Sequence, residues 1–144
     1  MTGRPTTLKR VRPGLRGFTL LECVVVALVV AVLSSIAWPS FRRHELQAGR
    51  LDAVQALSRL QAAQERYRSA HGLYAPDLSV LSGTSAQSPQ GRYTIHLVPD
   101  GAEGYLARAQ ALGQQVQDRP CAALTLQVKQ GFAQQGPEAS CWRQ

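Results

Sequence analysis

The stretch Gly17–Glu22 (GFTLLE) decides the architecture of this 144-residue chain, because it ends a basic leader and opens a long apolar run. Every side chain from 23 to 33 is apolar, and Glu22 is the only charged residue between Phe18 and Phe41. An acidic residue in a membrane-length helix costs about 2.5–3.5 kcal/mol at the helix centre and less near an end. We therefore expect Glu22 to have a functional role.

The apolar segment from Phe18 to Trp38 is long enough to cross a bilayer. At about 1.5 Å per residue, a helix over this segment spans roughly 30 Å. A cleaved secretory signal is the alternative, because Ser35–Ala37 offers a small-x-small cleavage site before Trp38. The long apolar run and its acid argue against such a signal, so we expect the helix to remain in the mature protein.

The formal net charge of +7 is unevenly distributed along the chain. The leader, residues 1–17, has no acidic residue and contains Arg4, Lys9, Arg10, Arg12 and Arg16. The remaining residues carry 11 basic and 9 acidic side chains. The basicity therefore fits the cytoplasmic flank that orients a membrane helix and is a poor indicator of a nucleic-acid partner.

The N-terminal pattern resembles that of type IV prepilins and type II secretion pseudopilins. Several features must coincide for this resemblance: a basic leader, the Gly17–Phe18 junction, an acid at the fifth residue after the glycine, and the apolar run. The segments Trp38–Arg43, Glu65–Tyr67 and Gly72–Tyr74, together with the Cys121…Cys141-Trp142 ending, are similar to PilE-type minor pilins.

The resemblance implies roles for three residues at this end of the chain. A prepilin peptidase would cut after Gly17, and the new N-terminal Phe18 would be methylated. Glu22 would then meet the positive N-terminus of a neighbouring subunit during assembly, an attraction that strengthens as the dielectric falls. The alternative for Glu22 is a favourable interaction with the dipole of its own helix, worth about 0.3–1 kcal/mol.

After the membrane segment, the pattern predicts a continued helix packed on a sheet. Pro39 should kink the helix, which then continues with an apolar stripe at 3–4 spacing until Gly72 stops it. The stripe comprises Leu46, Ala53, Val54, Leu57, Leu60, Ala63, Gln64 and Tyr67, while Arg42, Arg43, Arg50, Asp52, Arg59, Glu65 and Arg66 should occupy the other faces. Strands are expected at 93–98, 105–112, 123–129 and 132–133.

The expected fold class is α+β, with a long N-terminal helix packed on a small antiparallel β-sheet, the type IV pilin fold. Four segments follow from this. They are a basic leader (1–17), a transmembrane half of the helix (18–38), an amphipathic half (39–72), and a head of loop, sheet and C-terminal disulfide loop (73–144).

The disulfide joins Cys121 and Cys141 if the head lies outside the cytoplasmic membrane, where the compartment permits such a bond. Two free thiols or a metal pair are the alternatives, although no third or fourth ligand lies near in sequence. Cys23, within the apolar run, is expected to be a small apolar filler.

The sequence contains no phosphate-binding loop, zinc spacing or nucleophile elbow, and His44, His71 and His96 are far apart. We therefore expect no enzyme and no catalytic, cofactor-binding or metal site. Six helix arginines could follow DNA phosphates, namely Arg42, Arg43, Arg50, Arg59, Arg66 and Arg68. The first two follow the membrane segment, where lipid headgroups are the nearer anions, and the others alternate with acids, so direct nucleic-acid binding is not expected.

The resemblance implies a structural subunit, a minor pilin assembled into a type IV pilus that serves adhesion, twitching motility or DNA uptake. Its partners would be other pilin subunits, the inner-membrane assembly platform, the prepilin peptidase and, before assembly, membrane lipid. No small-molecule substrate is implied. It would begin as a single-pass inner-membrane protein with a periplasmic head and end in the extracellular pilus. The alternative is a type II secretion pseudopilin, which commonly lacks the C-terminal disulfide.

Overall fold

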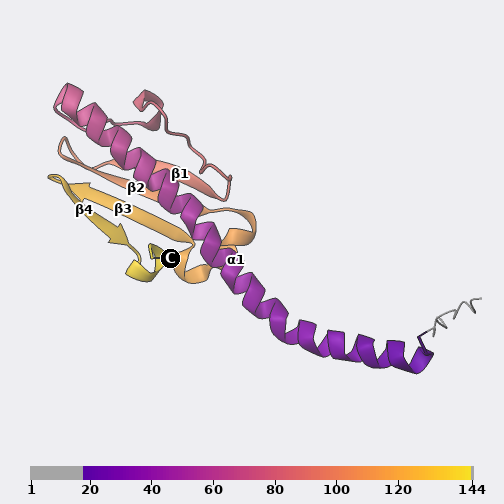
Figure 1. Ribbon diagram of the computed structural model, residues 1–144. Helices are drawn as coiled ribbons and strands as arrows, with labels where there is room; N and C mark the ends of the chain where they lie inside the picture. Colours follow the sequence, from indigo (N-terminus) through magenta and orange to yellow (C-terminus); the bar gives the residue numbers. More distant parts are fainter. Residues whose placement is uncertain (1–17, 144) are drawn as a thin grey trace, which may run out of the picture. The chain divides into compact units, whose positions relative to one another are not determined.

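The computed structural model describes residues 18–143, which form two compact units that divide after Trp38. One helix, α1 (Leu20–His71), contributes to both units (Figure 1). The first unit contains the apolar part of α1. The second unit, called the head from here on, begins at Pro39 and contains the rest of α1 and the sheet. The leader (1–17) lies outside the described residues, and the bend expected at Pro39 stays a prediction.

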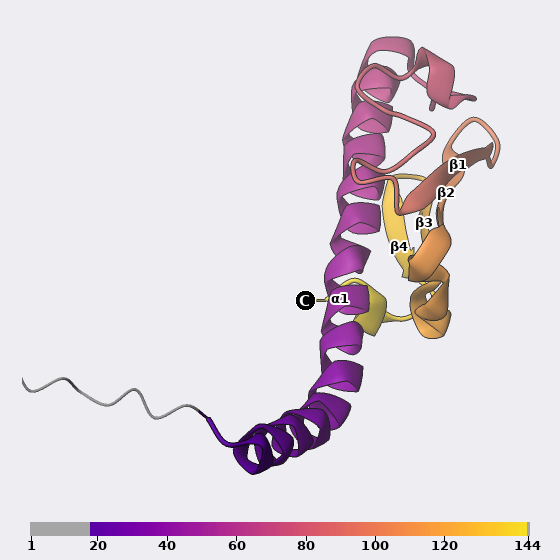
Figure 2. The ribbon, with the colours of Figure 1, turned by 90° about the vertical axis from the view of Figure 1, so that its right-hand side faces the viewer.

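The sheet has four antiparallel strands in sequence order, β1 (Tyr93–Pro99), β2 (Gly104–Ala111), β3 (Ala123–Lys129) and β4 (Phe132–Gly136). The head part of α1 packs along one face of this sheet (Figure 2). The α+β pilin-like fold expected from the sequence is therefore confirmed. All four strands are close to their expected positions, and β2, whose alanines and glutamines also suit a helix, is paired on both sides.

Turn chemistry sets the ends of several elements. Gly72 has a positive φ of 78° and its N–H bonds the Arg68 carbonyl at 2.8 Å, which ends α1 where the sequence predicted. Gln130 and Gly131 both have positive φ, as a two-residue type I′ hairpin between β3 and β4 requires. This turn fixes the pairing of Lys129 with Phe132.

The core lies between α1 and the inner face of the sheet. Its helix side is formed by Ala53, Leu57 and Leu60, and its sheet side by alternate residues of the strands, including Tyr93, Tyr105 and Leu124. These residues are at most 1% exposed. Alternation of buried and partly buried positions along β3 shows why its period-two pattern was the clearest strand signal.

The environment of Asp52 on α1 differs from the one expected. We expected it on a solvated face, but it is only 1% exposed and holds the connecting loop. Its carboxylate accepts hydrogen bonds from Ser88 Oγ at 2.5 Å, from the Gln90 N–H at 2.9 Å and from the Arg92 N–H at 3.2 Å. A carboxylate can be buried when its oxygens are satisfied in this way. Hydrophobic periodicity cannot show such a partner forty residues away.

Gln64, predicted in the stripe, fastens the other end of the same loop. Its side chain donates to the Ala75 carbonyl at 3.1 Å and accepts from the Ala75 N–H at 2.8 Å. The loop then covers the beginning of the outer edge of β1, because Gln87 bridges to Thr94 and the Ile95 N–H bonds the Ala86 carbonyl. One edge of the sheet is thus partly covered by the loop, while β4 forms the other edge.

Candidate functional site

The N-terminus of α1 is capped by a side chain of the preceding residue. Thr19 precedes the helix, and its Oγ1 accepts a hydrogen bond from the Glu22 N–H at 3.3 Å. The Thr-x-x-Glu spacing is that of a capping box, a signal that our sequence analysis did not use. Glu22 therefore lies in the first helical turn, where an acid also stabilises the positive end of the helix dipole.

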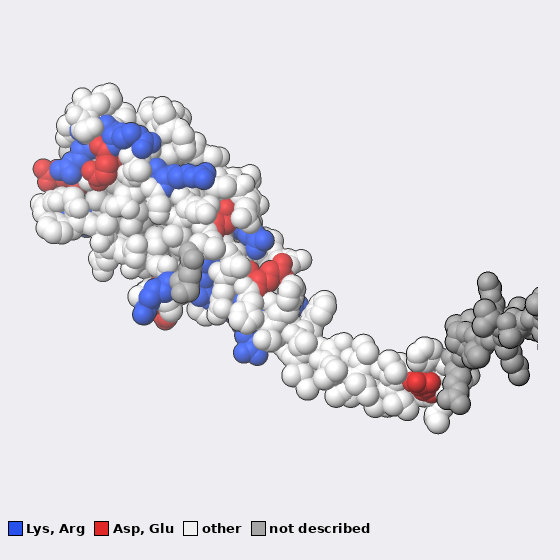
Figure 3. Space-filling model, in the orientation of Figure 1, with Lys and Arg blue, Asp and Glu red and all other residues white. Residues whose placement is uncertain are grey.

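The described part of the first unit has no core of its own. Every residue from Phe18 to Trp38 is exposed, and none of the most apolar 18-residue window is buried. By length and composition α1 is the one described helix able to cross a membrane. Figure 3 shows this part as uncharged apart from one acidic spot, and Glu22 is its only charged residue. Such a surface suits lipid or other apolar helices.

The structure places only some of the predicted N-terminal residues. Gly17 lies outside the described residues, so the processing site stays a prediction. Phe18 is described and is 78% exposed. Cys23 is exposed and forms no disulfide, and nothing in its surroundings assigns it a function.

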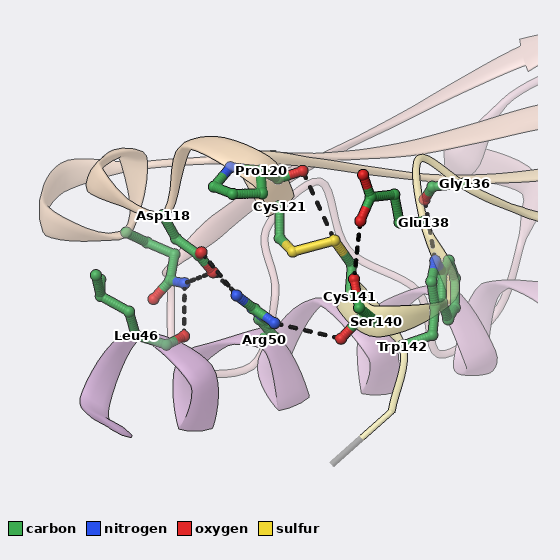
Figure 4. The surroundings of a disulfide bond; sticks show 11 residues. Leu46, Arg50, Asp118, Pro120, Cys121, Gly136, Glu138, Ser140, Cys141 and Trp142 are labelled. Atoms are coloured by element: carbon green, nitrogen blue, oxygen red, sulfur yellow. Dashed lines mark hydrogen bonds and ion pairs between the residues drawn. A yellow bond between two sulfur atoms is a disulfide. The ribbon is translucent and has the colours of Figure 1, made fainter. Parts of the chain in front are cut away.

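The base of the head is defined here as the contacts between residues 42–50 of α1 and the segments 113–121 and 138–143. The predicted disulfide joins these two segments (Figure 4). Cys121 and Cys141 are bonded with a Cα–Cα distance of 5.5 Å, and each is 1% exposed. The pairing expected from the resemblance is therefore confirmed. The bond closes a segment that contains β3 and β4.

Arg50 is the second link in the base of the head. Its guanidinium donates to both carboxylate oxygens of Asp118, at 2.7 and 2.8 Å, and to the Ser140 carbonyl at 3.3 Å. The hydrogen bonds to Asp118 raise the pKa of Arg50, although burial opposes them. We expected Arg50 on a solvated face. It is half-buried instead, because the cysteine-containing segments bring an acid and a carbonyl to it.

Two further contacts follow the same face of α1. Arg42 donates to Gln117 Oε1 at 2.9 Å, and Gln115 Nε2 donates to the Leu46 carbonyl at 2.9 Å. Gly49 is needed here, because a Cβ at this position would lie 2.0 Å from Gln115 Oε1. Positions 42, 46, 49 and 50 share one helical face. Together they hold the segment before β3 against the helix.

The described residues hold no group of three or more His, Cys, Asp or Glu side chains that could bind a metal ion. Two ion pairs occur among them, Arg50–Asp118 and Lys129–Asp100. On the face of the head seen in Figure 3, basic and acidic atoms are interspersed. Arg68 is also engaged, since it donates to the Tyr74 hydroxyl at 3.2 Å and lies over its ring.

The comparisons with known proteins agree with this arrangement. Residues 14–38 match the prokaryotic N-terminal methylation motif, and residues 39–125 match the family described as type IV minor pilin ComP, DNA uptake sequence receptor. The second match covers more than half of the chain. This chain belongs to the ComP family of type IV minor pilins.

Similar proteins include both pilins and secretion proteins. The type IV major pilin protein PilE of Neisseria gonorrhoeae is 27% identical over 54% of this chain and 47% of its own length. The type IV major pilin protein PilA of Myxococcus xanthus is 31% identical over 47% of this chain and 31% of its own length. The type II secretion system core protein G of Klebsiella pneumoniae is 31% identical over 65% of this chain and 64% of its own length.

The matched segments thus span less than two thirds of each of these relatives. Family membership and the apolar helix together indicate a membrane-anchored pilin. The family is structural and not enzymatic.

Proposed function

We propose that this chain is a structural minor pilin, which is cut after Gly17, methylated at Phe18 and assembled into a type IV pilus through its apolar helix. The observation that carries the proposal is the contrast within α1. Its apolar half has only exposed side chains, while its head half is packed on a sheet. An apolar surface of this size requires a partner. Lipid supplies it before assembly, and the helices of other pilins supply it in the fibre.

Glu22 has two functions in this proposal. Within the subunit its N–H completes the cap from Thr19. Between subunits its carboxylate attracts the methylated amine of a neighbouring Phe18, and the low dielectric of a helix bundle strengthens that attraction. Because the carboxylate is in the first helical turn, the ion pair selects one stagger between adjacent helices.

Further parts of the proposal follow from family membership. The partners are other pilins, the inner-membrane assembly platform and the prepilin peptidase. The head is periplasmic before assembly and extracellular afterwards. The disulfide supports this placement, because such bonds persist in oxidising compartments. We propose no catalytic activity.

The test replaces Glu22 with Ala in cells that assemble the fibre. Membrane insertion should be unchanged, while the amount of subunit in sheared fibres should fall by about tenfold or more, the order expected for loss of a charged contact. Glu45→Ala, an exposed acid of the head part of α1, is the matched control. Normal incorporation of the Glu22→Ala subunit would remove the assembly role from this residue.

Mass spectrometry of the membrane-extracted protein tests the processing step. The N-terminus should be Phe18, with the mass of one added methyl group. An N-terminus at Trp38 would support a cleaved secretory signal and would overturn the proposal as a whole.

A type II secretion pseudopilin is the second candidate, favoured by the match to core protein G. The Cys121–Cys141 disulfide favours the pilus. Deleting the gene distinguishes the two: loss of fibres with normal secretion supports the pilin, and loss of secretion with normal fibres supports the pseudopilin.

The printed description of the matched family also makes DNA binding by the head a candidate role. The head arginines outside the two ion pairs are the residues that would contact phosphate. We favour the structural role, because Arg42, Arg50 and Arg68 are already engaged within the head. Duplex DNA binding by the full chain, with an affinity that falls steeply as salt rises, would establish the additional role.

A further inference from the structure

The outer sheet face, defined as the side chains of β1–β4 that point away from α1, is free of acidic residues. None of the four strands contains Asp or Glu. Apart from the buried tyrosines Tyr93 and Tyr105, the charged or titratable side chains that the strands contain are His96, Arg108 and Lys129. Lys129 is neutralised by Asp100 in the β1–β2 turn, at 3.0 Å. His96 and Arg108 have no such acid beside them.

These two residues lie directly opposite each other in the β1–β2 register. Both are exposed, and neither side chain forms a hydrogen bond or ion pair within the described part of the chain. An acid opposite an arginine would stabilise a strand pair, so a histidine opposite Arg108 contributes less to stability than an acid would. A depression of about 400 Å³ surrounds the pair and is lined by Val98, Leu106 and Gln110 as well.

The surroundings define the ligand chemistry. The Arg108 guanidinium presents parallel donors that match one carboxylate. Thr125, opposite Arg108 on β3, can donate and accept hydrogen bonds, as the hydroxyl groups of a sugar require. The Gln110 amide already donates to the Ala122 carbonyl at 3.3 Å, and its second N–H and its oxygen can serve the same purpose. Val98 and Leu106 are cross-strand partners and give an apolar strip beside them, against which the C–H face of a sugar ring can lie.

We propose that the outer sheet face binds an acidic polysaccharide through a uronate carboxylate at Arg108 and His96. A nucleic-acid duplex fits this face less well. Binding of duplex DNA depends largely on the neutralisation of several phosphates by Lys and Arg, and this face offers one free arginine and one histidine. The opposite face of the sheet is covered by α1 (Figure 2), so the outer sheet face is the one that a long polymer can lie across.

The test measures binding of polygalacturonate to the full chain in detergent micelles by calorimetry. Arg108→Gln should weaken binding by about tenfold or more, because it removes a charge-assisted hydrogen bond. His96→Arg should tighten binding, because it places a permanent charge beside the first. Arg59→Gln, an exposed arginine of α1 without an ion pair, is the matched control and should bind as the unmodified protein does.

Two further probes separate this site from a general attraction of polyanions. Dextran, a neutral polysaccharide, should not bind, and duplex DNA should not compete with polygalacturonate for the protein. Absence of polygalacturonate binding, or an equal loss in Arg108→Gln and Arg59→Gln, would overturn the proposal. Because every measurement uses unassembled protein, failure here would leave the role in fibre assembly intact, and failure of assembly would leave this site intact.

Discussion

The two halves of α1 have opposite relations to the rest of the chain. In the head half, Leu57 is fully buried and Asp52 and Gln64 fasten a loop. In the apolar half, no described side chain is buried. Both halves are α-helical, so the difference lies in their side chains. The head can therefore be stable in a single subunit, whereas the apolar half needs other molecules around it.

The sharpest test of this contrast is a matched pair of leucine truncations on the same helix. Leu57→Ala should lower the free energy of unfolding of the head by about 2–5 kcal/mol, because Leu57 is in the core. Leu28→Ala should change it by less than about 0.5 kcal/mol, because Leu28 is 64% exposed. Urea unfolding of the full chain in micelles, followed by near-UV circular dichroism, measures both. Equal losses would show that the apolar half also packs within one subunit.

Removing the disulfide tests whether the base of the head needs a covalent link. Replacing both Cys121 and Cys141 with Ser should destabilise the head by about 3 kcal/mol, the chain-entropy value for a closed segment of this size. The same unfolding measurement applies, with Cys23→Ser as the control. An unchanged midpoint would mean that Arg50 and its partners hold the C-terminal segment unaided.

Replacing Asp52 tests the contact between α1 and the connecting loop. Asp52→Ala should cost about 2–3 kcal/mol, because it leaves the Ser88 hydroxyl and two backbone N–H groups without their acceptor. Glu103→Ala, an exposed acid, should have little effect. Faster hydrogen exchange at Gln90 and Arg92 should accompany the loss. If exchange at these two amides were unaltered, the loop would be held by something other than this carboxylate.

The smallest expected effect concerns the hydroxyl of Tyr93. Burial raises the pKa of Tyr93 to about 12, against an opposing effect of the nearby Gln115 side chain, and the Tyr93 hydroxyl has no hydrogen bond of normal geometry among the described residues. Since the folded-state pKa exceeds the ordinary value of 10, the associated stability is complete below pH 10 and is lost as pH rises toward 12.

Tyr93→Phe should therefore be neutral or slightly stabilising at pH 7, by up to about 1 kcal/mol, because it removes an unpaired buried hydroxyl. It should also reduce the fall in stability between pH 10 and 12, measured as unfolding midpoints across that range. Burial raises the pKa of Tyr105 as well, so part of the fall should remain. An unaltered dependence of the unfolding midpoint on pH would show that other groups cause the whole fall in stability.

Most of the fold could be predicted from sequence because its signals are local. The apolar run, the glycine that ends α1 and the alternation in β3 each act within a few residues, and each was found where expected. The burial of Asp52 and Arg50 could not be predicted in this way. Their partners, Ser88 and Asp118, lie 36 and 68 residues away, and only the folded chain brings them together.

The same distinction between local and long-range signals applies to the candidate site. Gly17, Phe18 and Glu22 are predicted from a compact motif and their roles stay predictions, while the predicted disulfide is confirmed by the geometry. The Thr19 cap could have been found from its Thr-x-x-Glu spacing. The cross-strand pair of His96 and Arg108 could not, because it depends on the register of two strands separated by a turn.

The loop bonded to the start of β1 has a consequence for misassembly. With Gln87 and Ala86 already bonded to Thr94 and Ile95, strand addition between unfolding copies is blocked at the beginning of that edge. At the other edge, Pro137 directly follows β4 and cannot donate a backbone hydrogen bond, which limits how far added strands extend there. Aggregates of this subunit should therefore grow through short strand pairings.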